Sequence, residues 1–107
     1  MARLSERQQI VEKIFEFLGD NNLLEFVGTT GQRGRYRYIL FGRPRTLDGE
    51  VRVYSRNFIQ VRFQTGYRCL PKNDSRVFES EQNAIAFLRA AFVDKDPTTA
   101  YAVPTKE

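Results

Sequence analysis

The side chains of this chain that could do chemistry are arginines and tyrosines, and they gather in its central part. Residues 31–72 carry ten positive charges, nine of them Arg, against two negative charges, whereas both flanking segments are net negative. An Arg guanidinium grips phosphate with a planar fork of donors, and both Arg and Tyr stack on nucleobases. Such a segment is typical of a surface that binds nucleic acid.

Three parts of this segment combine the residue types that such a surface needs. Residues 50–64 alternate apolar and polar side chains, residues 28–35 form a Gly-rich basic loop, and residues 42–46 place two Arg around a Pro. The predicted phosphate contacts are Arg33, Arg35, Arg37, Arg43 and Arg45. The predicted stacking and base-edge contacts are Tyr36, Tyr38, Tyr54, Arg52, Arg62 and Gln60. The alternative interpretation is an ordinary solvated strand face with two solvated loops.

Catalysis has little support among the residue types. The chain has no His, so the common general base and the commonest metal ligand are both missing, and Cys69 has no His to activate it. We therefore predict no catalytic residue, no cofactor and no metal. Glu50-Val51-Arg52, with Asp48 nearby, resembles the acidic motif of the restriction-endonuclease-like nucleases, with Arg in place of Lys. A metal-dependent nuclease is therefore a minor alternative.

Helices are predicted towards both ends of the chain. Ser5 followed by Gln8 is typical of a helix N-cap. Apolar residues then recur at helical spacing until Gly19, a residue that favours the left-handed conformation at a helix end. Ser80 caps the second predicted helix, whose apolar residues continue to Phe92.

Between the helices the apolar period changes to two, which predicts strands. The predicted strands cover residues 23–28, 36–41, 50–55, 58–64 and 67–70, and Asp48-Gly49 is a predicted turn. Short connections make neighbouring strands antiparallel. The predicted fold class is therefore α+β: an antiparallel β-meander of four to five strands, flanked by an N-terminal and a C-terminal α-helix packed on one sheet face.

Alternation also assigns the two faces of the predicted sheet. The residues expected to point toward the helices are Val51, Val53, Ile59, Val61 and Phe63, which leaves Arg52, Tyr54, Gln60, Arg62 and Arg68 on the opposite face. Tyr36 and Tyr38 share one face of their strand, and Arg35 and Arg37 share the other. Which pair joins the opposite face depends on strand register, which the sequence leaves open.

Length and composition bound the organisation of the chain. The 107 residues predict one domain over residues 1–97, followed by an extended or loosely held tail over residues 98–107. One cysteine and the absence of a long apolar run indicate a cytoplasmic protein with no membrane partner.

The order of elements is similar to that of two nucleic-acid-binding families. From about Ser5 to Phe92, the order helix, strands, helix resembles the double-stranded-RNA-binding domain, with Glu79-Ser80-Glu81-Gln82 where that family has a Lys cluster. A four-strand meander followed by a helix resembles the single-stranded-DNA-binding fold of the Whirly and transcription-coactivator type. That resemblance implies dimerisation through helices. Neither resemblance rests on a shared motif.

The predicted function is a non-catalytic nucleic-acid-binding domain, with the choice between DNA and RNA and between single and double strands left open. The alternative is a protein–protein interaction module. In that case the basic face would form a homodimer, or would dock an acidic partner protein in the manner of a small phage or mobile-element regulator, because Tyr and Arg are also enriched in protein interfaces.

Overall fold

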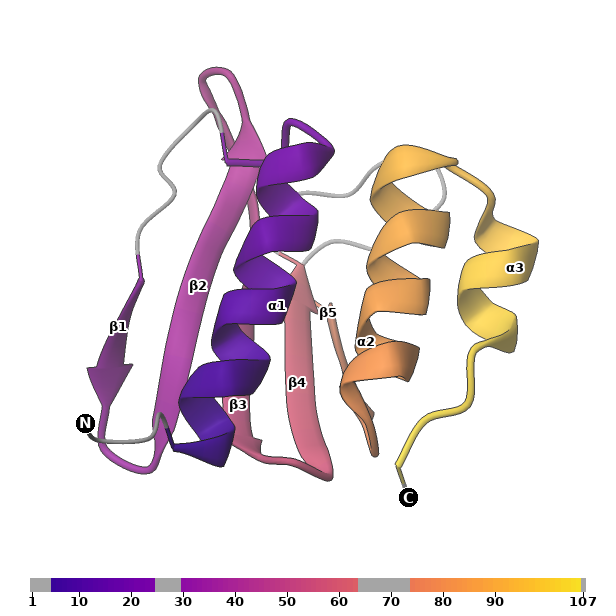
Figure 1. Ribbon diagram of the computed structural model, residues 1–107. Helices are drawn as coiled ribbons and strands as arrows, with labels where there is room; N and C mark the ends of the chain where they lie inside the picture. The colour runs from indigo at the N-terminus through magenta and orange to yellow at the C-terminus, as the bar shows by residue number, and fades with distance from the viewer. Residues whose placement is uncertain (1–4, 25–29, 64–73, 107) are drawn as a thin grey trace.

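The computed structural model describes residues 5–24, 30–63 and 74–106, and its centre is one antiparallel sheet. The strands follow one another in space as they do in the chain, in the order β1 (Thr30–Arg33), β2 (Tyr36–Arg43), β3 (Thr46–Ser55), β4 (Phe58–Phe63) and β5 (Asp74–Phe78) (Figure 1). This arrangement confirms the predicted α+β fold with an antiparallel meander. Alternating side chains give the sheet one apolar face, which needs a cover.

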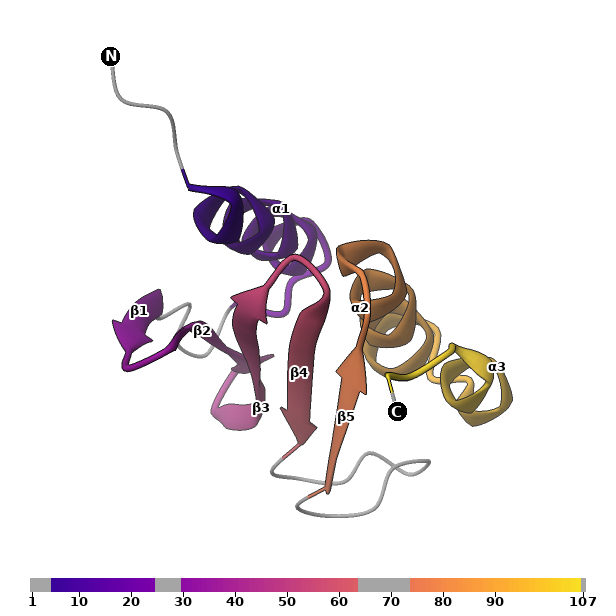
Figure 2. The same ribbon diagram turned by 90° about the horizontal axis from the view of Figure 1, so that it is seen from below.

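Helices supply that cover on one side of the sheet. They are α1 (Glu6–Asp20), α2 (Glu81–Leu88), the π-helical continuation η1 (Arg89–Val93) and α3 (Pro97–Ala102). α1 contacts β2 and β3, whereas α2 contacts β4 and β5. Both helices lie on the same side of the sheet, and α3 lies beyond α2 (Figure 2). None of the described helices is long and apolar enough to cross a membrane.

The ends of the long helices follow the predicted capping signals with one exception. The Ser5 and Ser80 hydroxyls accept hydrogen bonds from the backbone N–H groups of Gln8 and Asn83, both at 3.1 Å. The left-handed residue after α1 is Asn22, with φ 61°, and not the predicted Gly19. Gly19 is instead part of the helix, because the chain continues helically for one more residue.

The core lies between the sheet and the helices. The side chains predicted to point toward the helices are buried, with Val51, Val61 and Ile59 fully inaccessible. Phe63 on β4 stacks on Phe87 of α2 with ring centroids 5.4 Å apart. Aromatic pairs of this kind stabilise a core beyond the area that they bury.

The predicted turn at Asp48-Gly49 is wrong. Both residues lie inside β3, and the chain reverses at Pro44-Arg45, where Arg45 has φ 63°. A register shift between Phe41 and Gly42 leaves Asp48 as the extra residue of a β-bulge. Gly49 is needed for close packing rather than for turning, because a Cβ there would collide with the carbonyl oxygen of Arg62.

The first and last strands also differ from the prediction. In the predicted strand 23–28, the Leu23 carbonyl oxygen accepts a hydrogen bond from the Gly42 N–H at 2.6 Å, and Leu24 forms an isolated parallel bridge to Gly42. Residues 25–28 lie outside the described residues. The first described strand is β1, which begins at residue 30. The predicted strand over 67–70 and its Arg68 lie outside the described residues, and β5 was not predicted.

The segment 98–107 is not extended throughout, because most of α3 lies within it. Asp96 caps α3, and Ala100 is fully buried against the rest of the molecule. Beyond the helix, the Lys106 backbone N–H donates to the Val77 carbonyl oxygen at 2.7 Å. This bond places the C-terminal segment along the outer edge of β5.

Candidate nucleic-acid interface

Strand register decides which side chains share the sheet face opposite α1 and α2. Tyr38 pairs with Arg52, and Arg52 pairs with Gln60, so β2, β3 and β4 contribute to one cross-strand row. Tyr36 and Tyr38 therefore join this face, which answers the question that the sequence left open. We call it the open face and define it by Arg33, Tyr36, Tyr38, Glu50, Arg52, Tyr54, Phe58, Gln60 and Arg62. No helix within the described residues covers it (Figure 2).

Three aromatic rings follow one another across the open face. The Tyr36 and Tyr54 ring centroids are 5.0 Å apart, and those of Tyr54 and Phe58 are 5.1 Å apart. The three residues belong to β2, β3 and β4, so the row runs across the strands. Side chains at such cross-strand positions lie close enough to hold one another in place. The row is therefore a preformed aromatic surface.

Two arginines lie over the tyrosine rings. The Arg52 guanidinium carbon is 4.5 Å from the Tyr36 ring centroid, and that of Arg33 is 5.2 Å from the Tyr38 centroid. These distances are within the range of cation–π attraction. The open face thus presents positive charge directly beside flat aromatic groups.

Glu50 is the negative charge of the open face. Its Oε1 accepts from Arg52 Nε at 2.9 Å and from Arg62 Nη1 at 3.3 Å. The Glu50 side chain is 8% exposed, whereas those of Arg52 and Arg62 are 20% and 44% exposed. Burial by itself would lower the pKa of Arg52, but hydrogen bonds to Glu50 and Tyr54 outweigh it and raise that pKa above its ordinary value. Because the Arg62 side chain is more exposed than that of Arg52, Arg62 offers the larger accessible surface to a ligand.

Gln60, the remaining predicted residue of the open face, is hydrogen-bonded to a residue of the edge strand β5. Its Nε2 donates to the Ser75 Oγ at 3.3 Å. This bond orients the amide at the β4–β5 side of the face, away from the aromatic row.

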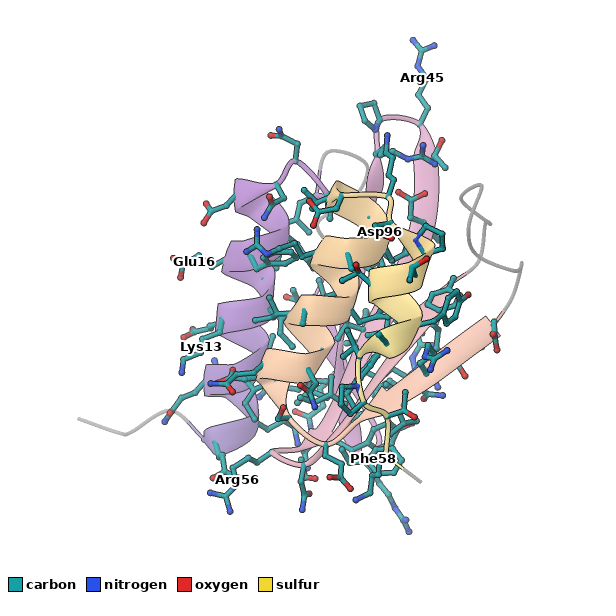
Figure 3. The ribbon with its side chains drawn as sticks, turned by 90° about the vertical axis from the view of Figure 1, so that its right-hand side faces the viewer. Lys13, Glu16, Arg45, Arg56, Phe58 and Asp96 are labelled. Atoms are coloured by element: carbon teal, nitrogen blue, oxygen red, sulfur yellow. The ribbon has the colours of Figure 1, made fainter. Side chains whose placement is uncertain are left out.

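The hairpin between β2 and β3 carries the next predicted phosphate contacts. Arg43 is bound to the buried Asp48, with Nε to Oδ2 at 3.1 Å, Nη2 to Oδ1 at 2.9 Å and its backbone N–H to Oδ2 at 3.2 Å. Asp48 therefore neutralises the positive charge of Arg43, and the three hydrogen bonds between the two residues stiffen the hairpin. Arg45 lies at the tip and points away from the body of the molecule (Figure 3).

Arg35 and Arg37 are not brought together with the open face. Arg35 lies in the exposed turn between β1 and β2. Arg37 pairs with Val53 and Gln32, and therefore points to the side that the helices cover. Arg37, one of the predicted phosphate contacts, therefore lies on the other side of the sheet from Arg52.

Alternation could have identified Glu50 as part of the open face, because it lies two residues before Arg52. From its residue type alone, Glu50 is expected only as a metal ligand. Among the described residues, no group of three His, Cys, Asp or Glu side chains could hold a metal ion.

Comparison with models of protein families, with curated protein sequences and with solved structures gives no match to this chain.

Proposed function

We propose that this protein binds single-stranded nucleic acid on the open face, without catalysis. The observation that supports this proposal is the row of Tyr36 and Tyr54, with the Arg52 guanidinium over the Tyr36 ring. Proteins that bind single strands combine aromatic side chains, on which bases stack, with basic groups that follow the phosphates. The open face supplies both within one sheet.

Shape supports a single strand over a duplex. In a single strand the unstacked bases are available to lie on tyrosine rings, whereas in a duplex they are stacked on one another. In the proposed complex, bases stack on Tyr36, Tyr38 and Tyr54. Phosphates contact Arg62 of β4 and Arg33 of β1. The sheet holds these groups rigidly, so little side-chain entropy is lost on binding.

The protein–protein interaction module remains the second candidate, and one observation favours it. Glu50 already supplies a carboxylate to Arg52 and Arg62, so the charge available to phosphates is smaller than the count of arginines suggests. A partner protein would rely on one or two buried aromatic anchors rather than on the sum of the charges.

The decisive experiment is fluorescence anisotropy with labelled single-stranded and double-stranded DNA and RNA, at low and at physiological salt. We expect a single strand to bind more tightly than either duplex, with an affinity that falls as salt rises. Arg62→Gln should weaken binding and lower the salt slope by about one phosphate contact. Tyr36→Ala should weaken binding by about 1–3 kcal/mol, the range for one stacked base.

Arg56→Gln is the matched control, because it removes one positive charge from the exposed β3–β4 turn near Glu6, outside the open face. It should leave affinity nearly unchanged. If no nucleic acid binds at physiological salt, or if Arg56→Gln weakens binding as much as Arg62→Gln, the open face is not the binding site.

A further inference from the structure

Glu50 uses only one of its two carboxylate oxygens within the described part of the chain. Oε1 accepts from both Arg52 and Arg62, at 2.9 and 3.3 Å. Oε2 accepts no hydrogen bond from a described residue, and it is not sealed off from solvent. The whole side chain is only 8% exposed, so Oε2 is a largely desolvated acceptor on the open face. A hydrogen bond to such an acceptor is stronger than one to a carboxylate surrounded by water.

The neighbours of Glu50 hold this carboxylate in place beside the aromatic row. Glu50 lies on the central strand β3 and is directly opposite Arg62 of β4. The two guanidinium groups fix the carboxylate through Oε1. The guanidinium carbon of Arg52 also lies 4.5 Å from the Tyr36 ring centroid. One guanidinium group therefore links Glu50 to the aromatic row, and a base bound at that row can bring its edge to Oε2.

The Watson–Crick edges of the bases differ in what they offer to a carboxylate. Guanine presents two adjacent donors, the N1–H and the N2 amino group. Adenine and cytosine present one amino group beside an acceptor nitrogen, whereas thymine and uracil present one N–H between two carbonyl oxygens. An ionised carboxylate only accepts hydrogen bonds, so it attracts donors and repels other acceptors. Proteins read the unstacked bases of a single strand through hydrogen bonds to these edges.

We propose that Glu50 makes the open face prefer guanine, with Oε2 accepting from the N1–H and the N2 amino group of the base. The inference rests on the proposed function, because it assigns a base preference to the same site. Arg62 remains a phosphate contact in this arrangement, since its side chain is 44% exposed. A carboxylate on a phosphate-binding face lowers the affinity for every strand, but it lowers the affinity least for a strand that offers donors to it.

The test compares short labelled DNA strands of equal length by fluorescence anisotropy with the whole chain at one salt concentration. Each strand is thymine throughout, or carries guanine, hypoxanthine or adenine at one central position. We expect the guanine strand to bind about tenfold more tightly than the adenine strand, the scale of one good base-edge contact. Hypoxanthine keeps the N1–H but lacks the amino group, so its strand should fall between them. Adenine controls for the stacking of a purine ring.

Glu50→Gln removes the negative charge and keeps the shape of the side chain. This variant should bind the guanine and adenine strands about equally, and should bind the all-thymine strand at least as tightly as the original chain does. Glu12→Gln makes the same change of net charge on α1, outside the open face, and should keep the preference for guanine.

Two results would overturn the inference while the proposed function stands. In the first, the original chain binds the guanine, hypoxanthine and adenine strands equally tightly, a comparison that needs no variant and so does not depend on how a variant folds. In the second, Glu50→Gln keeps the preference for guanine. If no single strand binds at all, the proposed function fails, and the base preference fails with it.

Discussion

Glu50 is the residue with most influence on the charge of the open face. Its carboxylate is nearly inaccessible, yet it contacts Arg52 and Arg62, two of the three arginines there. A phosphate bound at these arginines must compete with Glu50 or share them with it. Glu50 therefore stabilises the fold while it weakens the attraction for an anionic ligand.

Glu50→Gln should separate these two effects. Loss of the charged acceptor should lower the free energy of unfolding by about 2 kcal/mol, the scale of hydrogen bonds to a charged group. The additional net positive charge should raise affinity for a single strand severalfold at low salt. Urea denaturation and fluorescence anisotropy measure the two quantities.

Glu12→Gln is the control for Glu50→Gln, because it makes the same change of net charge on α1, across the sheet. It should alter neither quantity appreciably. A fall in affinity on Glu50→Gln would show that Glu50 positions Arg52 and Arg62 for the ligand instead of competing with it.

At the scale of elements, α3 depends on a cap that titrates. The Asp96 carboxylate accepts from the Thr99 hydroxyl at 2.6 Å and from the Thr99 backbone N–H at 3.3 Å. The side-chain hydrogen bond from Thr99, followed by the backbone bond, lowers the pKa of Asp96 below its ordinary value of 3.8. Its contribution to stability is therefore present above that ordinary value and is lost as the pH falls through the lower pKa of the folded state.

Amide hydrogen exchange of residues 99–102 should accelerate as the pH falls below about 3.8, after correction for the intrinsic pH dependence of exchange. In Asp96→Asn, the cap is retained but no longer titrates, so this acceleration should be absent. An equal acceleration in both chains would assign the change to other acids.

Side-chain alternation predicted the interior of the sheet well, because burial on one face leaves a strand no freedom to shift by one residue. Val51 and Val53 are buried, and Arg52 lies on the other face, as expected. Turn signals were less reliable. Asp48-Gly49 has the composition of a hairpin turn, but it forms a bulge because Asp48 binds Arg43 across the hairpin.

Several residues of the candidate site could be predicted from the sequence, but the cross-strand pairs that they form could not. Residue types and alternation placed Arg52, Tyr54 and Arg62 on one face. The choice of the tyrosines of β2 over Arg37 required the register of β2 against β3, which arises from contacts between distant residues. The same contacts create the ion pairs of Glu50.

At the scale of the whole molecule, the contacts of α3 indicate where in the sequence the folded unit ends. Tyr101 packs on Phe87 with ring centroids 6.5 Å apart, and Ala100 is fully buried. A chain that stops at Lys95 should lose about 2 kcal/mol of unfolding free energy, the scale of uncovering one large apolar side chain. Thermal unfolding and binding of a hydrophobic dye report the loss.

A chain that stops at Val103 is the matched control for this truncation. It keeps α3 and removes the bond from the Lys106 N–H to the Val77 carbonyl oxygen, so it should lose only about 1 kcal/mol. If the chain ending at Lys95 is as stable as the full chain, the folded unit ends before α3, close to the boundary at residue 97 predicted from the sequence.

The strand order has a consequence for synthesis on the ribosome. Each strand lies beside its neighbour in the chain, so hairpins can close as they leave the exit tunnel. α1 is synthesised before the strands, so it can cover β2 and β3 as soon as they form. β4 and β5 are covered by α2, which is synthesised after them, so their apolar side chains stay uncovered until α2 has formed. During that interval Phe63 lacks its stacking partner Phe87. The nascent chain then displays an aromatic surface that chaperones, or other nascent chains, can bind.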